Sequence, residues 1–309
     1  MEENIQNKHD KGYKFLLGTK RLFVQLLRCF VQQGWAQKIV PEDVELVDKS
    51  FILQDFKDKE ADLVYKVKMD GKEVYFYLLE LQSTVDFQMP YRLLLYMVEV
   101  WRSILKDMDS KEAEKKDFKL PVIVPCVLYN GENNWTVARS FRETLVRNED
   151  FGEFVLDFKY ILFDVRRYSD EILLNLANVI GAAFFVDKTK DKEELLARLR
   201  VISQKLQSLT DDDIGALWKW LKNIVARGLS EEKQKQIEEI FQKERKMDNM
   251  VYAIERIMEQ ERVDTRREEK IEIARELLKM GIPLEKVETA TKLPLTTIQE
   301  LAQSIQSQQ

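Results

Sequence analysis

Residues 60–83, EADLVYKVKMDGKEVYFYLLELQS, constrain the fold more than any other part of the chain. They form two runs of strand-forming residues joined at Asp-Gly 70–71, a pair that favours tight turns between antiparallel strands. Asp62, Glu80 and Gln82 occupy positions where a strand pattern expects apolar residues. A carboxylate in an otherwise apolar strand is costly unless something compensates its charge. A metal ion would do so, and the hairpin therefore predicts a metal site.

The length of the turn decides whether the two carboxylates can meet. A two-residue turn at Asp70-Gly71 would place Asp62 and Glu80 on opposite faces of the hairpin. A three-residue loop from Met69, with Gly71 in the left-handed position, would make Asp62 and Glu80 diagonal neighbours on one face, about 7–8 Å apart. Two carboxylates at that separation can hold one divalent cation, and we predict the three-residue loop.

The composition favours a globular, helix-rich protein. The chain has 309 residues, 45% of them hydrophobic, which allows one large domain or two. Charged residues make up 33% with a net charge of −5, so a nucleic-acid signal must be local. The two cysteines, far apart in sequence, favour neither a disulfide framework nor a zinc site, and a cytoplasmic protein is expected. The N-terminal residues lack the apolar core of a signal peptide, and no apolar run is long enough to predict a membrane span.

The pattern predicts three parts: residues 1–165, residues 166–245 as a helical extension, and residues 246–309 as a long helix with a terminal helical hairpin. Within the first part, apolar periodicity predicts a helix over residues 10–33 and another from Met89 to Leu105, with Pro90 in its first turn. Strands are expected around residues 50–53, in the 60–83 hairpin, before the Asn-Gly turn at 130–131, and over residues 156–163. From Asp170 onward the pattern is helical.

Two further segments leave alternatives open. Between Lys8 and Lys38 seven Lys/Arg and one acid give +6, which fits either a solvated helix face or a phosphate-contacting face. The terminal helices are similar to a helix-turn-helix, but residues 282–309 carry two Lys and three Glu, net −1. DNA reading usually needs positive charge nearby, so a dimerising or capping hairpin is the alternative. A homodimer through the C-terminal helices is a hypothesis that follows.

Several short sequence motifs together resemble those of the Rpn family, whose members are called recombination-promoting nucleases or transposases. They cover roughly residues 8–190, with a looser likeness at the C-terminal tail. The motifs are His9-Asp10 with Lys14-Phe15, Ala61-Asp62-Leu63-Val64-Tyr65, Leu79-Glu80-Leu81-Gln82-Ser83, Tyr91-Arg92-Leu93-Leu94-Leu95-Tyr96, and Leu128-Tyr129-Asn130-Gly131 with Trp135.

This resemblance implies an α/β fold with the αβββαβ core of PD-(D/E)XK (restriction-endonuclease-like) nucleases, followed by an all-helical region. It implies a metal-dependent DNA endonuclease associated with recombination. Asp62, Glu80 and the carbonyl of Leu81 would hold Mg²⁺, Mn²⁺ or Ca²⁺, ions that prefer oxygen ligands. Gln82 stands where the superfamily pattern has Lys, so it offers neutral hydrogen bonds in place of a charge.

The resemblance also indicates His9 and Lys14 as candidate DNA contacts, although a cap for the first helix is an alternative role for His9. Arg92, at the start of a helix, could reach a phosphate near the metal or pair structurally within the protein. The alternative function is a catalytically weak or inactive nuclease-fold protein that binds DNA or assembles with other chains. A transposase in the strict sense ranks last, because the chain shows no larger Asp/Asp/Glu integrase arrangement.

Overall fold

The structure is a computed structural model that describes residues 12–47, 63–207, 209–225, 229–244 and 246–306. Contacts within the chain divide it into two units, Met1–Val225 and Ala226–Gln309. Each unit is considered by itself below. The division into residues 1–165, 166–245 and 246–309 stays a prediction.

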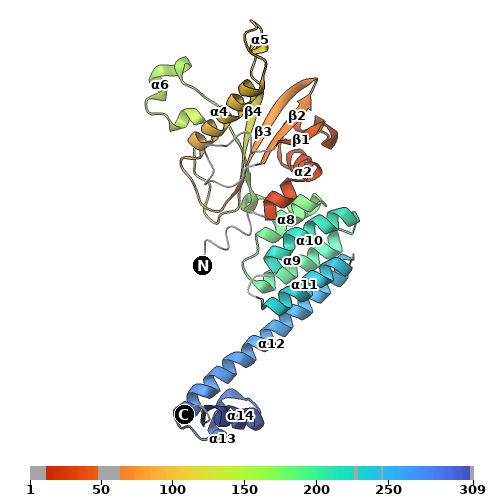
Figure 1. The fold of residues 1–309 in the computed structure, drawn as a ribbon, viewed down its shortest axis with the longest axis vertical. Coiled ribbons are helices and arrows are strands. Elements are labelled where there is room, and N and C mark those ends of the chain that lie inside the picture. Colours follow the sequence, from red (N-terminus) through yellow and green to blue (C-terminus); the bar gives the residue numbers. More distant parts are fainter. Residues whose placement is uncertain (1–11, 48–62, 208, 226–228, 245, 307–309) are drawn as a thin grey trace. The chain divides into compact units, whose positions relative to one another are not determined.

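The first unit is built around a mixed five-stranded sheet in the order β1-β2-β3-β4-β5 (Figure 1). Strands β1, β2 and β3 pair antiparallel, and β3, β4 and β5 pair parallel. The strands are β1 (Val44–Val47), β2 (Leu63–Met69), β3 (Lys72–Gln82), β4 (Val122–Tyr129) and β5 (Ile161–Asp164). This order confirms the expected α/β fold. The strand expected around residues 50–53 lies outside the described residues, and β1 was not predicted.

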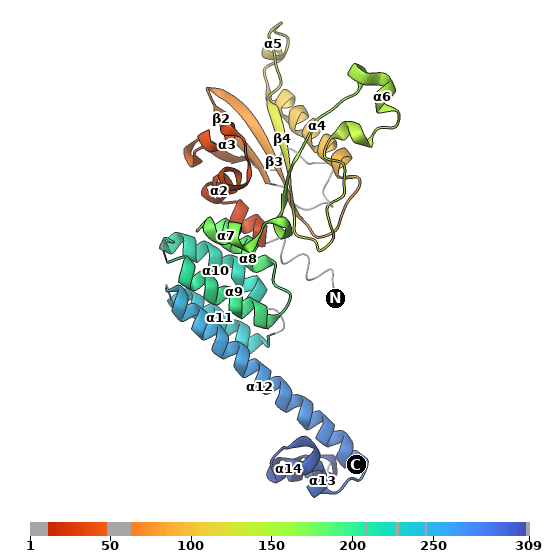
Figure 2. The same cartoon turned by 180° about the vertical axis from the view of Figure 1, so that it is seen from behind.

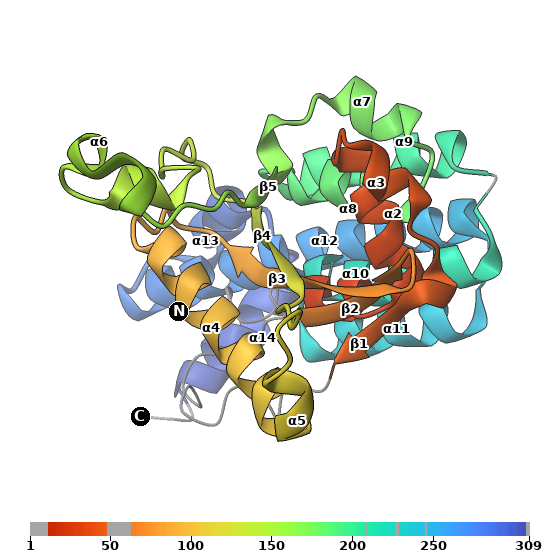
Figure 3. The ribbon, with the colours of Figure 1, turned by 90° about the horizontal axis from the view of Figure 1, so that it is seen from above.

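Helix α4 (Met89–Asp107) provides the crossover between β3 and β4 and covers one face of the sheet (Figure 3). Its buried stripe, which includes Leu93, Met97 and Val100, recurs at helical spacing. The stripe packs on strand residues of the same face, among them Val64 and Val127. The helix begins as predicted, with proline in its first turn, where a missing N–H costs nothing.

The opposite face of the sheet is covered by α2 (Lys20–Phe30) and α3 (Gly34–Lys38) (Figure 3). Phe23 of α2 stacks on Tyr65 of β2 with ring centroids 4.1 Å apart, and both rings are fully buried. The predicted continuous helix over residues 10–33 is wrong, because residues 12–17 form a separate helical turn that ends at Gly18. Glycine costs about 1 kcal/mol relative to alanine within a helix, and Thr19 adopts an extended conformation before α2 begins.

Four helices complete the first unit: α7 (Asp170–Asn175), α8 (Val179–Asp187), α9 (Lys192–Lys205) and α10 (Asp211–Val225). Every residue of α8 is buried, and the helix packs against α2, α7 and α10 (Figure 2). Asp211, Asp212 and Asp213 fill the first turn of α10, as expected for charges that favour a helix N-terminus. Asp213 also pairs with Arg21 at 2.5 Å.

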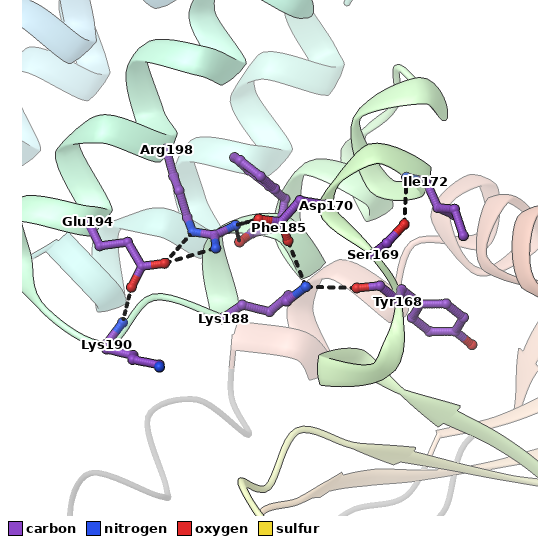
Figure 4. A network of polar contacts seen from close by, with 9 residues as sticks. All are labelled: Tyr168, Ser169, Asp170, Ile172, Phe185, Lys188, Lys190, Glu194 and Arg198. Carbon is purple, nitrogen blue, oxygen red and sulfur yellow. Dashed lines mark hydrogen bonds and ion pairs between the residues drawn. The ribbon is translucent and has the colours of Figure 1, made fainter.

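A network of ion pairs ties α7, α8 and α9 together (Figure 4). Asp170 accepts from Lys188 at 2.6 Å and pairs with Arg198 at 2.9 Å. Arg198 also binds Glu194 at 2.8 Å and donates to the backbone carbonyl of Phe185 at 3.1 Å. Both cations are therefore matched by carboxylates or carbonyls, and we call this set the Asp170 network.

The second unit is helical, as predicted: α11 (Glu231–Lys243), α12 (Met247–Lys279), α13 (Leu284–Thr291) and α14 (Leu295–Gln306). The first half of α12 packs on α11, and its end packs on α13 and α14. The buried residues of this terminal cluster include Ala274, Val287 and Ile298. No helix in the described part of the chain is both long and apolar enough to cross a membrane.

The remaining short elements lie in the connections. They are η1 (Pro41–Asp43), α5 (Ser110–Ala113), η3 (Phe141–Thr144), α6 (Asn148–Phe151), η4 (Gly152–Phe154) and η5 (Val165–Arg167).

Candidate active site at the carboxyl ends of the parallel strands

The turn between β2 and β3 differs from the prediction. Met69 pairs with Lys72, so the loop contains two residues, Asp70 and Gly71. Their φ angles of 49° and 77° are both left-handed, as a type I′ turn requires. The predicted three-residue loop is wrong because Asp-Gly suits both left-handed positions, and the twist of a type I′ turn matches that of the flanking strands.

This correction removes the parity argument that placed Asp62 and Glu80 on one face. Asp62 lies outside the described residues, and the structure describes the backbone of Glu80 but not its side chain. The described register pairs Leu63, the first residue of β2, with Leu78 of β3. Along the chain Asp62 directly precedes Leu63, and Glu80 follows Leu78 by two residues.

Strand β3 contains an irregularity at the position of the candidate carboxylate. Leu79 pairs with Val127 of β4, whereas the next pair joins Gln82 to Tyr129. Two residues of β3, Glu80 and Leu81, therefore stand opposite the single residue Leu128. Such a bulge interrupts the backbone ladder, re-aims side chains and is frequent beside active sites. The sequence pattern did not predict it, because a bulge depends on the pairing with the neighbouring strand β4.

Beyond the bulge, one row of residues crosses the ends of the three parallel strands. Gln82 of β3 pairs with Tyr129 of β4, which pairs with Asp164 of β5. Gln82 is half-buried, while Tyr129 is buried and packs on Trp135 with ring centroids 4.9 Å apart. Burial raises the pKa of Asp164, although the charge of Arg167 opposes the shift. In open α/β sheets, ligands bind outside the carboxyl ends of the strands, so this row marks a candidate site.

Asn130, the residue after β4, joins the row to the rest of the first unit. Its backbone N–H donates to the carbonyl of Gln82 at 3.1 Å. Its side-chain amide nitrogen donates to Asp187 at 2.9 Å. Its backbone carbonyl accepts a hydrogen bond from Nε of Arg166 at 2.8 Å. Burial and the carboxylate of Asp187 raise the pKa of Tyr13, which belongs to the helical residues 12–17. The buried carboxylate of Asp187 thus links Tyr13 of the first helical turn to Asn130, which binds the end of β3.

Gly131 is required by close packing at the same place. A Cβ atom at this position would lie 2.3 Å from the backbone carbonyl oxygen of Ser83 and 2.2 Å from the hydroxyl of Tyr129. Real Cβ atoms do not approach a backbone oxygen so closely, and Ser83 follows the last residue of β3. The Asn-Gly pair at 130–131, predicted as a turn, therefore also fixes how closely the loop after β4 approaches the end of β3.

The predicted DNA-contacting residues have different positions. His9 lies outside the described residues. Lys14 is half-buried in the helical turn 12–17, next to Tyr13. Arg92 of α4 forms an ion pair with Asp86 at 2.6 Å, and Asp86 also accepts from the backbone N–H of Gln88 at 2.9 Å. The structural role considered for Arg92 is thus observed, and its contact with a phosphate stays a prediction.

Within the described residues, no group of three or more His, Cys, Asp or Glu side chains lies close enough together to hold a metal ion. The predicted ligands Asp62 and Glu80 are not among the side chains described, so the expected Mg²⁺, Mn²⁺ or Ca²⁺ site stays a prediction. The free thiol of Cys126 is fully buried and Cys29 is half-buried.

Residues 7–216, more than half of the chain, match the family described as "Putative transposase, YhgA-like". The chain belongs to the YhgA-like transposase family. The YhgA-like match extends from before the helical turn 12–17 into α10, so it contains Asp62, Glu80, Gln82, Asn130 and Asp164. The second unit, Ala226–Gln309, lies entirely outside the matched residues.

The chain is also similar in sequence to the recombination-promoting nuclease RpnC of Escherichia coli (strain K12). It is 30% identical over 90 residues, which are 29% of this chain and 27% of RpnC. The similar segment therefore spans only about a quarter of the relative's length. No solved structure matches the chain significantly.

Proposed function

We propose that this YhgA-like protein is a divalent-metal-dependent DNA endonuclease that hydrolyses phosphodiester bonds at the bulged end of β3. The observation that carries the proposal is the bulge at Glu80-Leu81, at the carboxyl ends of the parallel strands. Membership in a transposase family and the likeness to a relative named a nuclease support a nuclease-like role.

The topology supports a PD-(D/E)XK-type core. A helix precedes three antiparallel strands, and the crossover helix α4 leads to β4, which runs parallel to β3. This is the αβββαβ order that the resemblance implied. Fold alone does not define function, so the argument for cleavage rests on the residues at the end of β3.

The candidate donors suit a hard divalent cation. Asp62 and Glu80 are carboxylates, and the backbone carbonyl of Leu81, within the bulge, is the third ligand in this proposal. Carboxylate and carbonyl oxygens favour Mg²⁺, Mn²⁺ or Ca²⁺ over softer metals. When bound, such an ion stabilises the charge that develops on the phosphate and lowers the pKa of an attacking water.

Gln82 orients the substrate in this proposal. Its side chain offers a neutral amide donor and a carbonyl acceptor, and its backbone is held by Asn130. It can hydrogen-bond a phosphate oxygen or the attacking water, but it supplies no charge. We therefore expect slower turnover than a lysine at this position would give, and Gln82→Lys is the variant that measures the difference.

A plasmid-nicking assay tests the proposal. Purified protein is incubated with supercoiled DNA in EDTA, Mg²⁺, Mn²⁺ or Ca²⁺. Nicking that requires a divalent ion and disappears in Asp62→Ala and Glu80→Ala supports it. Asp70→Asn is the matched control, because Asp70 is an exposed carboxylate of the same hairpin whose left-handed φ of 49° asparagine tolerates. Equal nicking by Asp62→Ala and wild type would show that the activity belongs to a contaminant.

A non-catalytic DNA-binding or assembly protein on the same fold is the second candidate. The neutral Gln82 and the separate helical second unit favour it. DNA binding without metal-dependent cleavage would select this candidate. A cytoplasmic location and a homodimer through the C-terminal helices α12–α14 complete the proposal, and light scattering of a chain that ends near Lys246 would test the dimer.

A further inference from the structure

Three arginines lie beside β5: two follow its last residue, Asp164, and the third contacts Tyr160, which directly precedes its first residue. They are Arg139, Arg166 and Arg167, here called the edge arginines. Nε of Arg167 is 3.5 Å from a carboxylate oxygen of Asp164, and Nε of Arg166 donates to the carbonyl of Asn130 at 2.8 Å. Arg139 donates to the carbonyl of Tyr160 at 3.2 Å, and its guanidinium lies 5.0 Å from the centroid of the Tyr160 ring. They come from two separate segments of the chain and lie along β5, the edge strand of the sheet.

The edge arginines act electrostatically on the row that begins at Gln82. Burial raises the pKa of Tyr129, and the charges of Arg166 and Arg167 counteract part of this shift. Burial raises the pKa of Asp164, and Arg139 is among the charges that oppose it. Because Tyr129 pairs with Gln82 in the sheet register, this positive charge stands beside the proposed site of cleavage.

The edge arginines differ from the cations of the Asp170 network in what their guanidinium groups already bind. Arg198 contacts two carboxylates and a backbone carbonyl through its three nitrogens. In the part of the chain that the structure describes, the contacts of Arg166 and Arg167 use Nε, and that of Arg139 uses one terminal nitrogen. A guanidinium carries five N–H donors in a planar fork, so terminal donors remain on each edge arginine.

The edge arginines are also accessible. The side chain of Arg167 is 54% exposed, Arg139 is exposed and Arg166 is half-buried. Among the described carboxylates, Asp164 is the one that forms an ion pair with them, and its separation from Arg167 of 3.5 Å is long for such a contact. A phosphate oxygen would be a better acceptor, because the guanidinium fork matches its geometry in two parallel bonds.

We propose that Arg139, Arg166 and Arg167 form a binding site for phosphates of the DNA backbone, next to Gln82. The site rests on the proposed function insofar as DNA is the substrate, but it requires no cleavage. It holds a phosphate neighbouring the scissile one, so that the strand is fixed in register over the bulge of β3. Phosphate contacts position a duplex without reading its sequence, so the site binds DNA irrespective of sequence.

The salt dependence of DNA binding tests this site directly. A fluorescently labelled duplex is titrated with full-length protein in EDTA, where no cleavage occurs, at several salt concentrations. Each lost phosphate contact reduces the slope of log K against log[salt] by about 0.9. We expect the triple variant R139Q/R166Q/R167Q to lower the slope by about 2–3 and to bind roughly 10–100-fold more weakly than wild type at 0.1 M salt.

The control removes the same charge elsewhere. Arg102, Arg147 and Arg262 have side chains 66%, 71% and 51% exposed, and each pairs with an acid three residues away. R102Q/R147Q/R262Q should keep the wild-type slope. The charge-conserving R139K/R166K/R167K should keep most of it, which separates loss of charge from loss of folding. Thermal unfolding of every variant checks that the fold is intact.

The outcomes separate this proposal from the proposed nuclease activity. Binding with a reduced slope in the edge variant supports the phosphate site even if no variant cleaves DNA. Equal slopes for the folded edge variant and wild type overturn the site even if wild type cleaves. A wild-type chain that does not bind DNA in this titration overturns it as well.

Discussion

Two aspartates that flank the segment from Val165 to Ser169 differ in side-chain exposure, in their ion pairs and in the direction of their pKa shifts. Asp170 is half-exposed, yet it forms ion pairs with Lys188 and Arg198 at 2.6 and 2.9 Å. Burial raises its pKa, but the hydrogen bond from Lys188 and the charge of Arg198 outweigh this, and the net shift is downward. Asp164 is more buried and has one arginine 3.5 Å away, so burial prevails and its pKa is raised.

We infer from this difference that Asp170 has a structural role and Asp164 a functional one. In the Asp170 network the charges satisfy one another and tie three helices together, which contributes to stability (Figure 4). At the strand edge a half-buried carboxylate is poorly matched, and among the described residues the edge arginines have guanidinium donors without an acceptor. Perturbed, incompletely paired groups in a strand-end site are typical of functional residues. We therefore expect changes in the network to affect stability and changes at the strand edge to affect activity.

Removal of the metal should produce the largest effect. EDTA should abolish cleavage, since loss of several kcal/mol of transition-state stabilisation is on the order of a 10³-fold fall in rate. Mg²⁺ or Mn²⁺ at about 100 times its Kd should stabilise the folded chain by about 2.7 kcal/mol. Calorimetry should show this rise in Tm for wild type and Asp70→Asn but not for Asp62→Ala. An equal rise in all three would place the metal elsewhere.

Arg198→Ala should cause the largest loss of stability. It removes the ion pairs with Asp170 and Glu194 and the stacking of Arg198 on Phe185, where the guanidinium lies 4.4 Å from the ring centroid. Because Asp170 is partly solvated, we expect a loss of about 2–3 kcal/mol, measured by urea unfolding. Arg102→Ala, which breaks an exposed pair with Glu99, should cost less than about 1 kcal/mol. Similar losses for both would mean that the network contributes no more than a surface pair.

Gly131→Ala should disturb the strand edge itself. The added Cβ would collide with the carbonyl oxygen of Ser83, and overpacking of this kind costs about 1–3 kcal/mol. We expect the cleavage rate to fall by more than the loss of folded protein accounts for, because the displaced backbone adjoins Gln82. Gly215→Ala in α10, where a Cβ meets nothing within 4 Å, is the control and should be neutral or stabilising. An active Gly131→Ala protein would show that the loop tolerates a shift.

The smallest effects should appear in pH-dependent stability, with opposite signs. The lowered pKa of Asp170 gives stability above the ordinary aspartate value that is lost as pH falls through the folded value. Asp170→Asn should therefore cost about 1 kcal/mol at pH 7 and less in acid. The raised pKa of Asp164 gives stability at low pH that is lost as pH rises through the folded value. Asp164→Asn should therefore gain relative to wild type from acid to neutral pH, and parallel pH profiles for the two variants would contradict the distinction.

Much of the fold follows from the sequence because periodicity and chain order carry it. The tight turn between β2 and β3, α4 with its first-turn proline, and the long helix α12 all have strong local signals. The break at Gly18 was missed because apolar spacing continues across it. Strand β1 has only four residues, Val44–Val47, and too short a pattern to be recognised.

The candidate site is less predictable because it depends on register. The pair Asp70-Gly71 predicts a tight turn, but the predicted loop length rested on a metal site shared by two carboxylates. The left-handed preference of Asp and Gly favours the two-residue loop that is observed. The bulge at Glu80-Leu81 depends on the pairing with β4 and has no local signature. Asp164, Arg166 and Arg167 follow the strand predicted over residues 156–163, and that placement was the available signal for them.

One paired measurement tests the distinction most directly: the rate of Mg²⁺-dependent plasmid cleavage and the Tm of Glu80→Gln and Arg198→Ala, each against wild type. We predict that Glu80→Gln loses cleavage on the order of 10³-fold with little change in Tm. Arg198→Ala should retain cleavage per folded molecule while its Tm falls by roughly 5–10 °C. Wild-type cleavage by Glu80→Gln would contradict the assignment of the catalytic site to the bulged end of β3.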